Sequence, residues 1–291
     1  CKKKDERQPE IKKLAVIATL FPIYDFAKNI GGEHAEVSLL MPPGIEPHGF
    51  EPRPEDIIRI NKADIFIYTG KYMEPWAEKI LKCIDNKSIV LIDSSKGINL
   101  IEKTDNHGHS DHAHSMDPHI WLDFKNAQKM VDNILEGFIA ADASNELGYK
   151  KNANNYKSML AELDNKFHEG LASCKTRYFI HGGHYAFGYM ARRYGLNYVS
   201  AYSGFSPNTE PSAQRLAELI RKIKRYDNKH IFYEELVSPR VAEAIARETG
   251  ANLLQLYAAH NITKEEWERG ATFIGLMEQT LANLKIGLQC Q

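Results

Sequence analysis

Short apolar runs alternate with amphipathic stretches along most of this chain. Residues 13–20 form a nearly continuous apolar run, as expected of a strand buried on both faces. After the break at Phe21-Pro22, a helical pattern continues to Gly31-Gly32. The same alternation predicts strands at 35–41, 63–69 and 88–93. It also predicts one helix that begins at Pro54 and another that covers 75–84. Strands that alternate with helices indicate a parallel sheet with helices on its faces.

From residue 123 onward the apolar spacing becomes helical over longer stretches. It predicts one helix over 123–141 and, after a break near 142–148, a second over 149–169. The second helix contains no Gly or Pro and is charged on its outer face, and about 20 residues of helix span roughly 30 Å. Alternation then returns, with strands expected at 177–181, 197–202, 230–234 and 252–257, and helices at 184–194, 211–225, 239–249 and 264–287.

These two sets of strands predict an α/β protein with two parallel-sheet α/β lobes joined by a long rigid helix. The 291 residues fit two domains of ordinary size. We expect a flexible N-terminal tether over 1–12, an N-terminal lobe over 13–143 with a histidine-rich loop at 105–116, a connecting helix over 144–173 and a C-terminal lobe over 174–291.

Charge and hydropathy exclude several classes of function. The formal net charge of −1 gives no field for steering nucleic acid or anionic lipid. No apolar run approaches the roughly 18–20 residues that a bilayer span needs. We therefore expect a soluble, monomeric chain with no nucleic-acid partner.

Cysteine usage suggests an exported chain. The first residue is Cys1, followed by a polar stretch up to Pro9. Bacterial lipoproteins carry their lipid on a cysteine at this position after removal of the signal peptide. Trimming of the chain would explain the same start, but the polar leader favours a lipid on Cys1 that anchors the protein to the membrane. None of Cys83, Cys174 and Cys290 has CxxC spacing, and inert thiols are favoured over a Cys174–Cys290 bridge.

Histidines are concentrated in one segment. His107, His109, His112, His114 and His119 fall within fifteen positions. Imidazole suits zinc, copper and nickel better than calcium, magnesium or manganese. Gly and Ser spacers favour a mobile loop for the first four, which therefore form an auxiliary metal-collecting loop. His119 stands apart, because Asp117-Pro118 and the following helical pattern can hold it rigidly.

Four histidines lie at or near the carboxyl ends of predicted strands, two in each half: His48, His119, His184 and His260. Ligands of open parallel sheets bind at this edge, so two facing lobes would bring them together across a cleft. Any one of them read alone is more often a solvated or structural residue, but together they favour a metal site. His181 fits a structural role in its strand, and His34, His168 and His230 are assigned nothing.

Three segments carry a specific resemblance: PGIEPHGFEP at 43–52, DPHIWLD at 117–123 and HYAFGY at 184–189. They resemble the ligand motifs of the metal-binding proteins of bacterial ABC importers for zinc and manganese, and the similarity extends over nearly the whole chain from Leu14. The resemblance implies two α/β lobes joined by one long helix, an ion held between them, an importer permease as partner, and in many members a lipid-anchored N-terminus. It makes His48, His119 and His184 the metal ligands.

The chain departs from that family at the fourth ligand. Members that favour manganese tend to have a carboxylate at the place of His184 and an Asp as fourth ligand, whereas Ala259 stands about where that Asp is expected. His260, a water molecule or a histidine of the 107–114 loop would complete the shell. Three imidazoles and one small ligand make an ordinary zinc site, and manganese prefers oxygen.

The function predicted from the sequence is that of an extracytoplasmic carrier, not an enzyme, that captures Zn²⁺ and delivers it to an importer permease. A manganese carrier of the same family, a zinc hydrolase and a metal-containing adhesin are the alternatives. A hydrolase needs a general base and a substrate pocket. Glu46 and Glu51 flank His48, but no HExxH motif appears.

Overall fold

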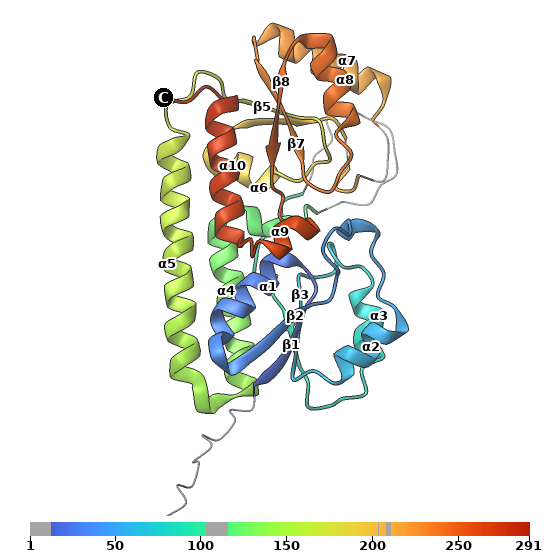
Figure 1. Ribbon diagram of the computed structural model, residues 1–291, viewed down its shortest axis with the longest axis vertical. Coiled ribbons are helices and arrows are strands. Elements are labelled where there is room, and N and C mark those ends of the chain that lie inside the picture. Colours follow the sequence, from blue (N-terminus) through green and yellow to red (C-terminus); the bar gives the residue numbers. More distant parts are fainter. Residues whose placement is uncertain (1–12, 103–115, 203, 208–210) are drawn as a thin grey trace, which may run out of the picture.

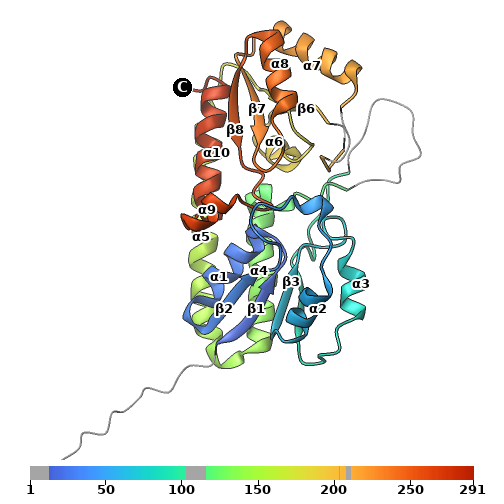
Figure 2. The same cartoon turned by 45° about the vertical axis from the view of Figure 1, so that its right-hand side comes forward.

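Two four-stranded sheets, with every strand pair parallel, organise the protein. The computed structural model describes residues 13–102, 116–202, 204–207 and 211–291. The strand orders are β2-β1-β3-β4 in the first sheet and β6-β5-β7-β8 in the second. The strands are β1 (Leu14–Ala18), β2 (Ala35–Leu39), β3 (Ile65–Tyr68), β4 (Val90–Asp93), β5 (Tyr178–His181), β6 (Asn197–Ser200), β7 (His230–Glu234) and β8 (Asn252–Leu256). Figures 1 and 2 show one sheet in each of two lobes, one above the other.

Helices cover both faces of each sheet. In the N-terminal lobe, α1 (Phe21–Gly31) and α4 (Phe124–Ala141) pack on one face, and α2 (Pro54–Asn61) and α3 (Ala77–Lys82) pack on the other. In the C-terminal lobe, α6 (Gly188–Tyr194) and α10 (Phe273–Gly287) share the central core, and α7 (Ala213–Arg225) and α8 (Arg240–Thr249) cover the opposite face. The remaining short helices are η1 (Gly32–His34), η2 (Pro47–Gly49), η3 (Ile120–Leu122), η4 (Ala143–Asn145) and α9 (Lys264–Glu268).

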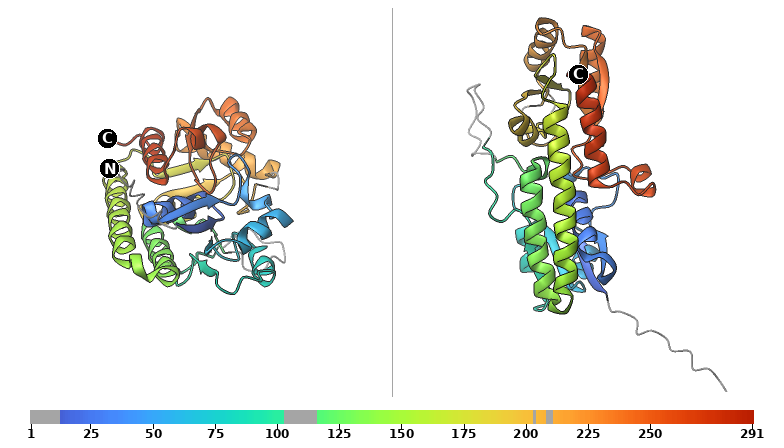
Figure 3. Two further views of the ribbon diagram at one scale, coloured as in Figure 1. Left: turned by 60° about the horizontal axis from the view of Figure 1, so that its bottom comes forward. Right: turned by 90° about the vertical axis from the view of Figure 1, so that its left-hand side faces the viewer.

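The helix α5 (Glu146–Gly170) runs along both lobes (Figures 1 and 3). Its 25 residues correspond to a length of about 37 Å. Its buried stripe repeats every three or four residues, which is the spacing of one helical face: Tyr149, Ala153, Tyr156, Leu160, Leu163 and Phe167. This stripe belongs to one apolar cluster that extends from β1 through α4 to α10. The two lobes therefore share a core, and the predicted fold of two parallel-sheet α/β lobes joined by a long helix is confirmed.

A buried ionic cluster also ties the lobes together. Arg193 of α6 contacts Asp123, which caps α4, with 3.1 Å between Nη1 and Oδ1. Its Nε donates to Asp164 of α5 at 2.6 Å. All three side chains are nearly buried, so solvent screens these contacts weakly.

Several predicted boundaries differ from the structure. The stretch expected as one helix over 264–287 is two helices, because Gly270 adopts a φ of 70° and Thr272 caps a new helix by accepting from the Gly275 amide. The helix expected from 184 begins only at Gly188, which leaves His184 in a loop. α5 begins at Glu146, three residues earlier than its apolar pattern indicated.

The interpretation of Cys174 and Cys290 as inert thiols is wrong, because they form a disulfide. The two cysteines pair through an antiparallel bridge that joins the end of α5 to the C-terminal residues. Their separation of 116 residues hides this proximity in the sequence. Cys83 is free and exposed, as expected.

Candidate metal centre

His48 is held by its own loop. It lies in η2 after β2, where Pro47 fixes the backbone at the first position. The Glu46 carboxylate accepts hydrogen bonds from the His48 amide at 3.1 Å and from the Gly49 amide at 3.2 Å. The imidazole Nε2 is buried and has no hydrogen-bond partner among the residues that the structure describes. This nitrogen is thus available to a ligand.

His119 is oriented by the carboxyl group two residues before it. Asp117 Oδ1 accepts from the His119 amide at 3.0 Å and lies 2.8 Å from Nδ1 of the ring. A carboxylate at Nδ1 fixes the proton on that nitrogen and leaves Nε2 as the electron-pair donor. Both residues are fully buried.

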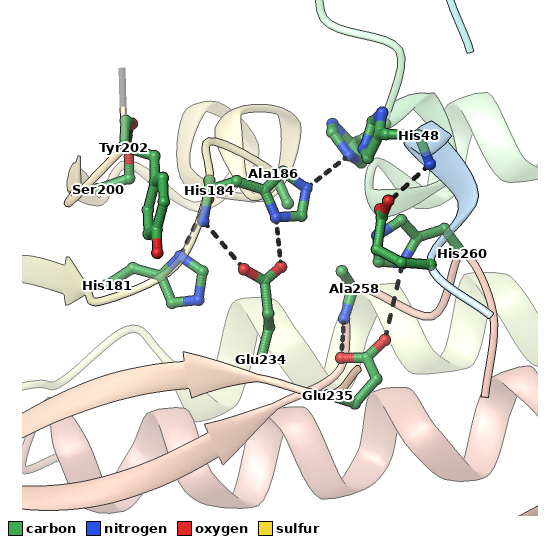
Figure 4. Close-up of polar contacts among 12 residues, drawn as sticks. His48, His181, His184, Ala186, Ser200, Tyr202, Glu234, Glu235, Ala258 and His260 are labelled. Carbon is green, nitrogen blue, oxygen red and sulfur yellow. Dashed lines mark hydrogen bonds and ion pairs between the residues drawn. The ribbon is translucent and has the colours of Figure 1, made fainter. Parts of the chain in front are cut away.

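His184 is oriented in the same way from a neighbouring strand. Glu234, at the end of β7, lies 2.7 Å from His184 Nδ1 through Oε2 and accepts the His184 amide through Oε1 at 2.9 Å. Figure 4 shows the ring standing between this carboxylate and the other histidines. Its Nε2 faces His119 Nε2 at 3.2 Å.

His260 lies in the connection from β8 to α9. Ala259 before it has a φ of 59°, which a non-glycine residue rarely adopts. The Glu235 carboxylate holds this turn by accepting from the Ala259 amide at 2.6 Å. It also accepts from the Ala258 amide at 3.0 Å (Figure 4). Glu235 Oε1 is also 3.8 Å from His260 Nδ1.

Asn261 joins this connection to the loop of His48. It is fully buried, and its Nδ2 donates to the carbonyls of Pro42 at 2.9 Å and Ile45 at 2.8 Å. The Gly44 amide adds a bond to the Ile262 carbonyl at 2.7 Å. The loop of His48 in one lobe is therefore hydrogen-bonded directly to the loop of His260 in the other lobe.

The four imidazoles meet at one point between the sheets. One ligand nitrogen of each of His48, His119, His184 and His260 lies within 4.8 Å of the others. In a tetrahedral zinc site with bonds of about 2.0–2.1 Å, ligand nitrogens stand about 3.3 Å apart. The His119–His184 pair is already at this separation, at 3.2 Å. The other separations are at most 4.8 Å, about 1.5 Å above the tetrahedral value, so side-chain movements of this size would bring all four nitrogens to an ion.

The environment sets the charge of these imidazoles. Burial, and then the proximity of the other histidines, holds the pKa of His48, His119 and His260 well below the ordinary value. His184 differs: burial alone would lower its pKa, but the charge and hydrogen bond of Glu234 raise it. Burial and the neighbouring Glu234 raise the pKa of Glu235 to about 8. The surroundings therefore favour neutral imidazoles at His48, His119 and His260, and they favour the protonated ring at His184, beside Glu234.

The structure brings together the four histidines that the sequence singled out. Among the three candidates for a fourth ligand, it places His260 in the cluster. His107, His109, His112, His114 and Cys1 lie outside the described residues. His181 makes structural contacts, since its Nδ1 lies 3.1 Å from the His184 carbonyl and 3.2 Å from the Tyr198 hydroxyl.

Sequence reasoning missed the carboxyl groups that orient the rings. Asp117, Glu234 and Glu235 are each nearly or fully buried and lie within 4 Å of a ring nitrogen. The position of Asp117 two residues before His119 was a usable signal. Glu234 and Glu235 gave none, because their proximity to His184 and His260 depends on the pairing of strands.

This protein has two lobes joined by a rigid helix, and the four histidines from both lobes meet between them. This arrangement defines the two-lobed class of solute-binding proteins. None of the helices in the described part of the chain is long and apolar enough to cross a bilayer. The chain belongs to the ZnuA family, described as the periplasmic component A of the zinc-uptake complex, whose model matches residues 16–287. The members of this family are solute-binding proteins of zinc uptake systems.

Relatives of known name are similar over nearly the whole chain. The high-affinity zinc uptake system protein ZnuA of Bacillus subtilis is 39% identical over 95% of this chain and 88% of its own length. The zinc-binding lipoprotein AdcA of Streptococcus pneumoniae is 36% identical over 94% of this chain, which spans only 55% of AdcA. The Zn(II)-bound crystal structure of the ZnuA-like domain of that AdcA has a TM-score of 0.81 and 34% identity, covering 95% of this chain and 99% of the domain.

Proposed function

We propose that this chain captures Zn²⁺ outside the cytoplasm and passes it to the permease of an ABC importer. The ligands in this proposal are His48, His119, His184 and His260. The observation that carries it is the convergence of four imidazoles, two from each lobe, within 4.8 Å of one another. Four nitrogen ligands in a tetrahedral shell suit zinc.

The same ligand set argues against the alternatives. A catalytic zinc keeps one position open for water, whereas four imidazoles fill a tetrahedral shell. A hydrolase is therefore less well supported than a carrier. Manganese prefers oxygen ligands, and here the carboxyl groups of Asp117, Glu234 and Glu235 lie beside the Nδ1 atoms of His119, His184 and His260 and do not belong to the cluster of possible ligand atoms. An adhesin is less well supported than a zinc carrier, because the similar laminin-binding proteins of known structure are 27% and 28% identical, whereas the similar zinc proteins reach 36% and 39%.

The location and partners form the finer part of the proposal. Family membership supports an extracytoplasmic protein that acts with an importer permease. We extend this to a lipid on Cys1, since AdcA is named a lipoprotein, and to a monomeric chain. Mass spectrometry of the protein recovered from membranes tests the lipid, and light scattering with and without zinc tests the monomer.

The ligands are tested by single substitutions to alanine at each of the four histidines. Because no protein ligand is redundant, each substitution should weaken zinc binding by more than the roughly 10–100-fold that loss of an outer hydrogen-bond partner costs. His168→Gln is the matched control, since this ring is half exposed and contacts Asp164 instead of the cluster. Competition against a zinc chelator gives the affinities.

X-ray absorption at the zinc edge provides a second readout. Four imidazoles at about 2.0–2.1 Å are expected in the wild type and three in each variant. A histidine whose removal leaves both affinity and imidazole count unchanged is not a ligand. If the wild type binds manganese more tightly than zinc under the same competition, the manganese carrier replaces the zinc carrier.

A further inference from the structure

The segment that carries His119 is hydrogen-bonded to a helix of the other lobe. This segment enters after β4 and leads into α4, so by chain order it belongs to the N-terminal lobe. The Asp117 carboxyl group orients His119, as described above. Asp117 itself lies against α6, the helix that follows His184.

The Tyr189 hydroxyl joins α6 to both sides of this segment. It donates to the Asp117 carbonyl at 3.1 Å and accepts from the Ile101 amide at 3.0 Å. The Asp117 amide in turn donates to the Ile101 carbonyl at 2.8 Å, and Glu102 pairs with Met116 in an antiparallel bridge. One fully buried hydroxyl of the C-terminal lobe therefore fixes the backbone on which Asp117 stands.

Gly188 allows the helix to approach the carboxyl group. A Cβ atom at this position would lie 2.7 Å from Asp117 Oδ2 and 2.7 Å from the ring of Tyr185. Real Cβ contacts do not reach such distances, so any other residue would push Asp117 or the helix away. Gly188, which leaves room for the Asp117 carboxyl group, and Tyr189, which binds the Asp117 carbonyl, thus both determine where Asp117 lies.

We propose that Gly188 and Tyr189 are positioning residues for His119: they hold Asp117, and through it the imidazole, in register with His184. The inference rests on the proposed function of the cluster as a zinc site. A helix of the C-terminal lobe, α6, thus determines where His119 of the N-terminal lobe lies. Because α6 contacts Asp117 across the two lobes, the geometry of the zinc site depends on how the lobes are arranged.

The first test is Tyr189→Phe, which keeps the ring and removes the hydroxyl. Loss of one buried hydrogen-bonding group that touches no ligand directly should weaken zinc binding by about three- to tenfold. Tyr156→Phe is the control, because that buried hydroxyl donates to Asp25 at 2.6 Å in the shared core. It should lower the unfolding temperature without changing zinc affinity.

A spectroscopic readout separates positioning from loss of stability. Co²⁺ bound in place of zinc has visible absorption bands that depend on the geometry of its ligands. Tyr189→Phe should shift these bands and Tyr156→Phe should not. Gly188→Ala should have a larger effect, roughly 10–100-fold on zinc affinity. Gly137→Ala, whose Cβ would strike the Ile92 side chain in the core, is its control for a steric clash that does not touch the site.

A double-mutant cycle tests the route through Asp117. In an Asp117→Ala background, Tyr189→Phe should weaken zinc binding by less than it does alone, because the carboxyl group that it positions is gone. Fully additive effects would overturn the proposal, as would an unchanged affinity and cobalt spectrum in a folded Tyr189→Phe protein. A wild type without a tight zinc site would instead overturn the proposed function.

Discussion

The protonation of the four imidazoles predicts how zinc affinity changes with pH. A histidine must be neutral to bind a metal, so each protonated ring costs one proton on binding. The four histidine positions alone indicate a steep dependence, since every ring brings its own proton. The structure changes this expectation. The pKa of His48, His119 and His260 is lowered by burial and by the neighbouring rings, and only that of His184 is raised.

The difference is large enough to measure. At pH 6, rings with an ordinary pKa of about 6.5 would be roughly three-quarters protonated, and four of them would release about three protons per zinc. With three rings already neutral, the release falls to about one proton from His184. A second proton comes from Glu235 if zinc at His260 ionises that carboxyl group, whose pKa is about 8. Each proton makes the dissociation constant rise tenfold per unit of falling pH, or about 1.36 kcal/mol.

The direction in which zinc affinity changes with pH follows from the raised pKa of His184. As the pH drops through that pKa, affinity should fall with a slope near one from His184, or near two if Glu235 also loses a proton on zinc binding. A steeper slope should appear only at lower pH, where the other three rings begin to take up protons. Chelator competition between about pH 5 and 8, with the protonation of the chelator taken into account, gives this profile. Calorimetry in buffers of different ionisation enthalpy counts the protons directly.

Glu234→Gln is the decisive variant, because Glu234 is what raises the pKa of His184. Its loss should flatten the profile near neutral pH while weakening binding at high pH by roughly 10–100-fold. Release of three or more protons at pH 6 by the wild type would refute the reasoning, since it requires charged rings at His48, His119 or His260. An unchanged slope in Glu234→Gln would refute the role given to the His184–Glu234 pair.

Three further outcomes are expected. Deleting 106–115 should leave the tight site intact, because the clustered histidines lie elsewhere, and should lower the amount of zinc bound per chain; loss of the tight site would make a loop histidine the fourth ligand. Replacing both Cys174 and Cys290 by Ser opens a link across 116 residues and should reduce the free energy of unfolding by about 2–5 kcal/mol, with zinc affinity unchanged. Asn261→Ala removes the hydrogen bonds to the Pro42 and Ile45 carbonyls and to the Ile262 amide, and should cost about 2 kcal/mol in urea unfolding. It should also weaken zinc binding, and equal affinity would show that these hydrogen bonds between the two loops do not align the histidines.

The order of elements could be predicted because this fold depends on local patterns. Buried parallel strands are continuous apolar runs, and the stripe of α5 repeats at helical spacing. Breaks were harder to locate where tertiary contacts decide them. The backbone turns at Gly270 between α9 and α10, which the sequence pattern predicted as one helix. His184 stays in a loop because its amide bonds to Glu234, which pulls the segment away from helical geometry.

The clustering of the four histidines could be predicted, and their orientation could not. His184 and His260 follow the ends of β5 and β8 closely, and the topology brings the loops of His48 and His119 to the same edge. The place of His260 depends on one turn. The positive φ of Ala259, held by two bonds to Glu235, directs His260 to the cluster. The residues around Ala259 give no local sign of this turn, because Glu235, which holds it, follows β7 and is distant in the sequence.

The placement of the carboxyl groups explains how such a centre can favour zinc and still release it. A divalent ion among neutral imidazoles needs nearby negative charge, because burying it unpaired is costly. Glu234 supplies that charge from behind the His184 ring, and its own pKa is lowered by this ring. As an outer partner it stabilises the ion without offering the oxygen ligand that manganese prefers. The raised pKa of His184 favours a proton on this ring, so the same carboxylate has a positively charged partner when that proton is bound. Zinc competes with this proton, and a lower pH therefore favours release.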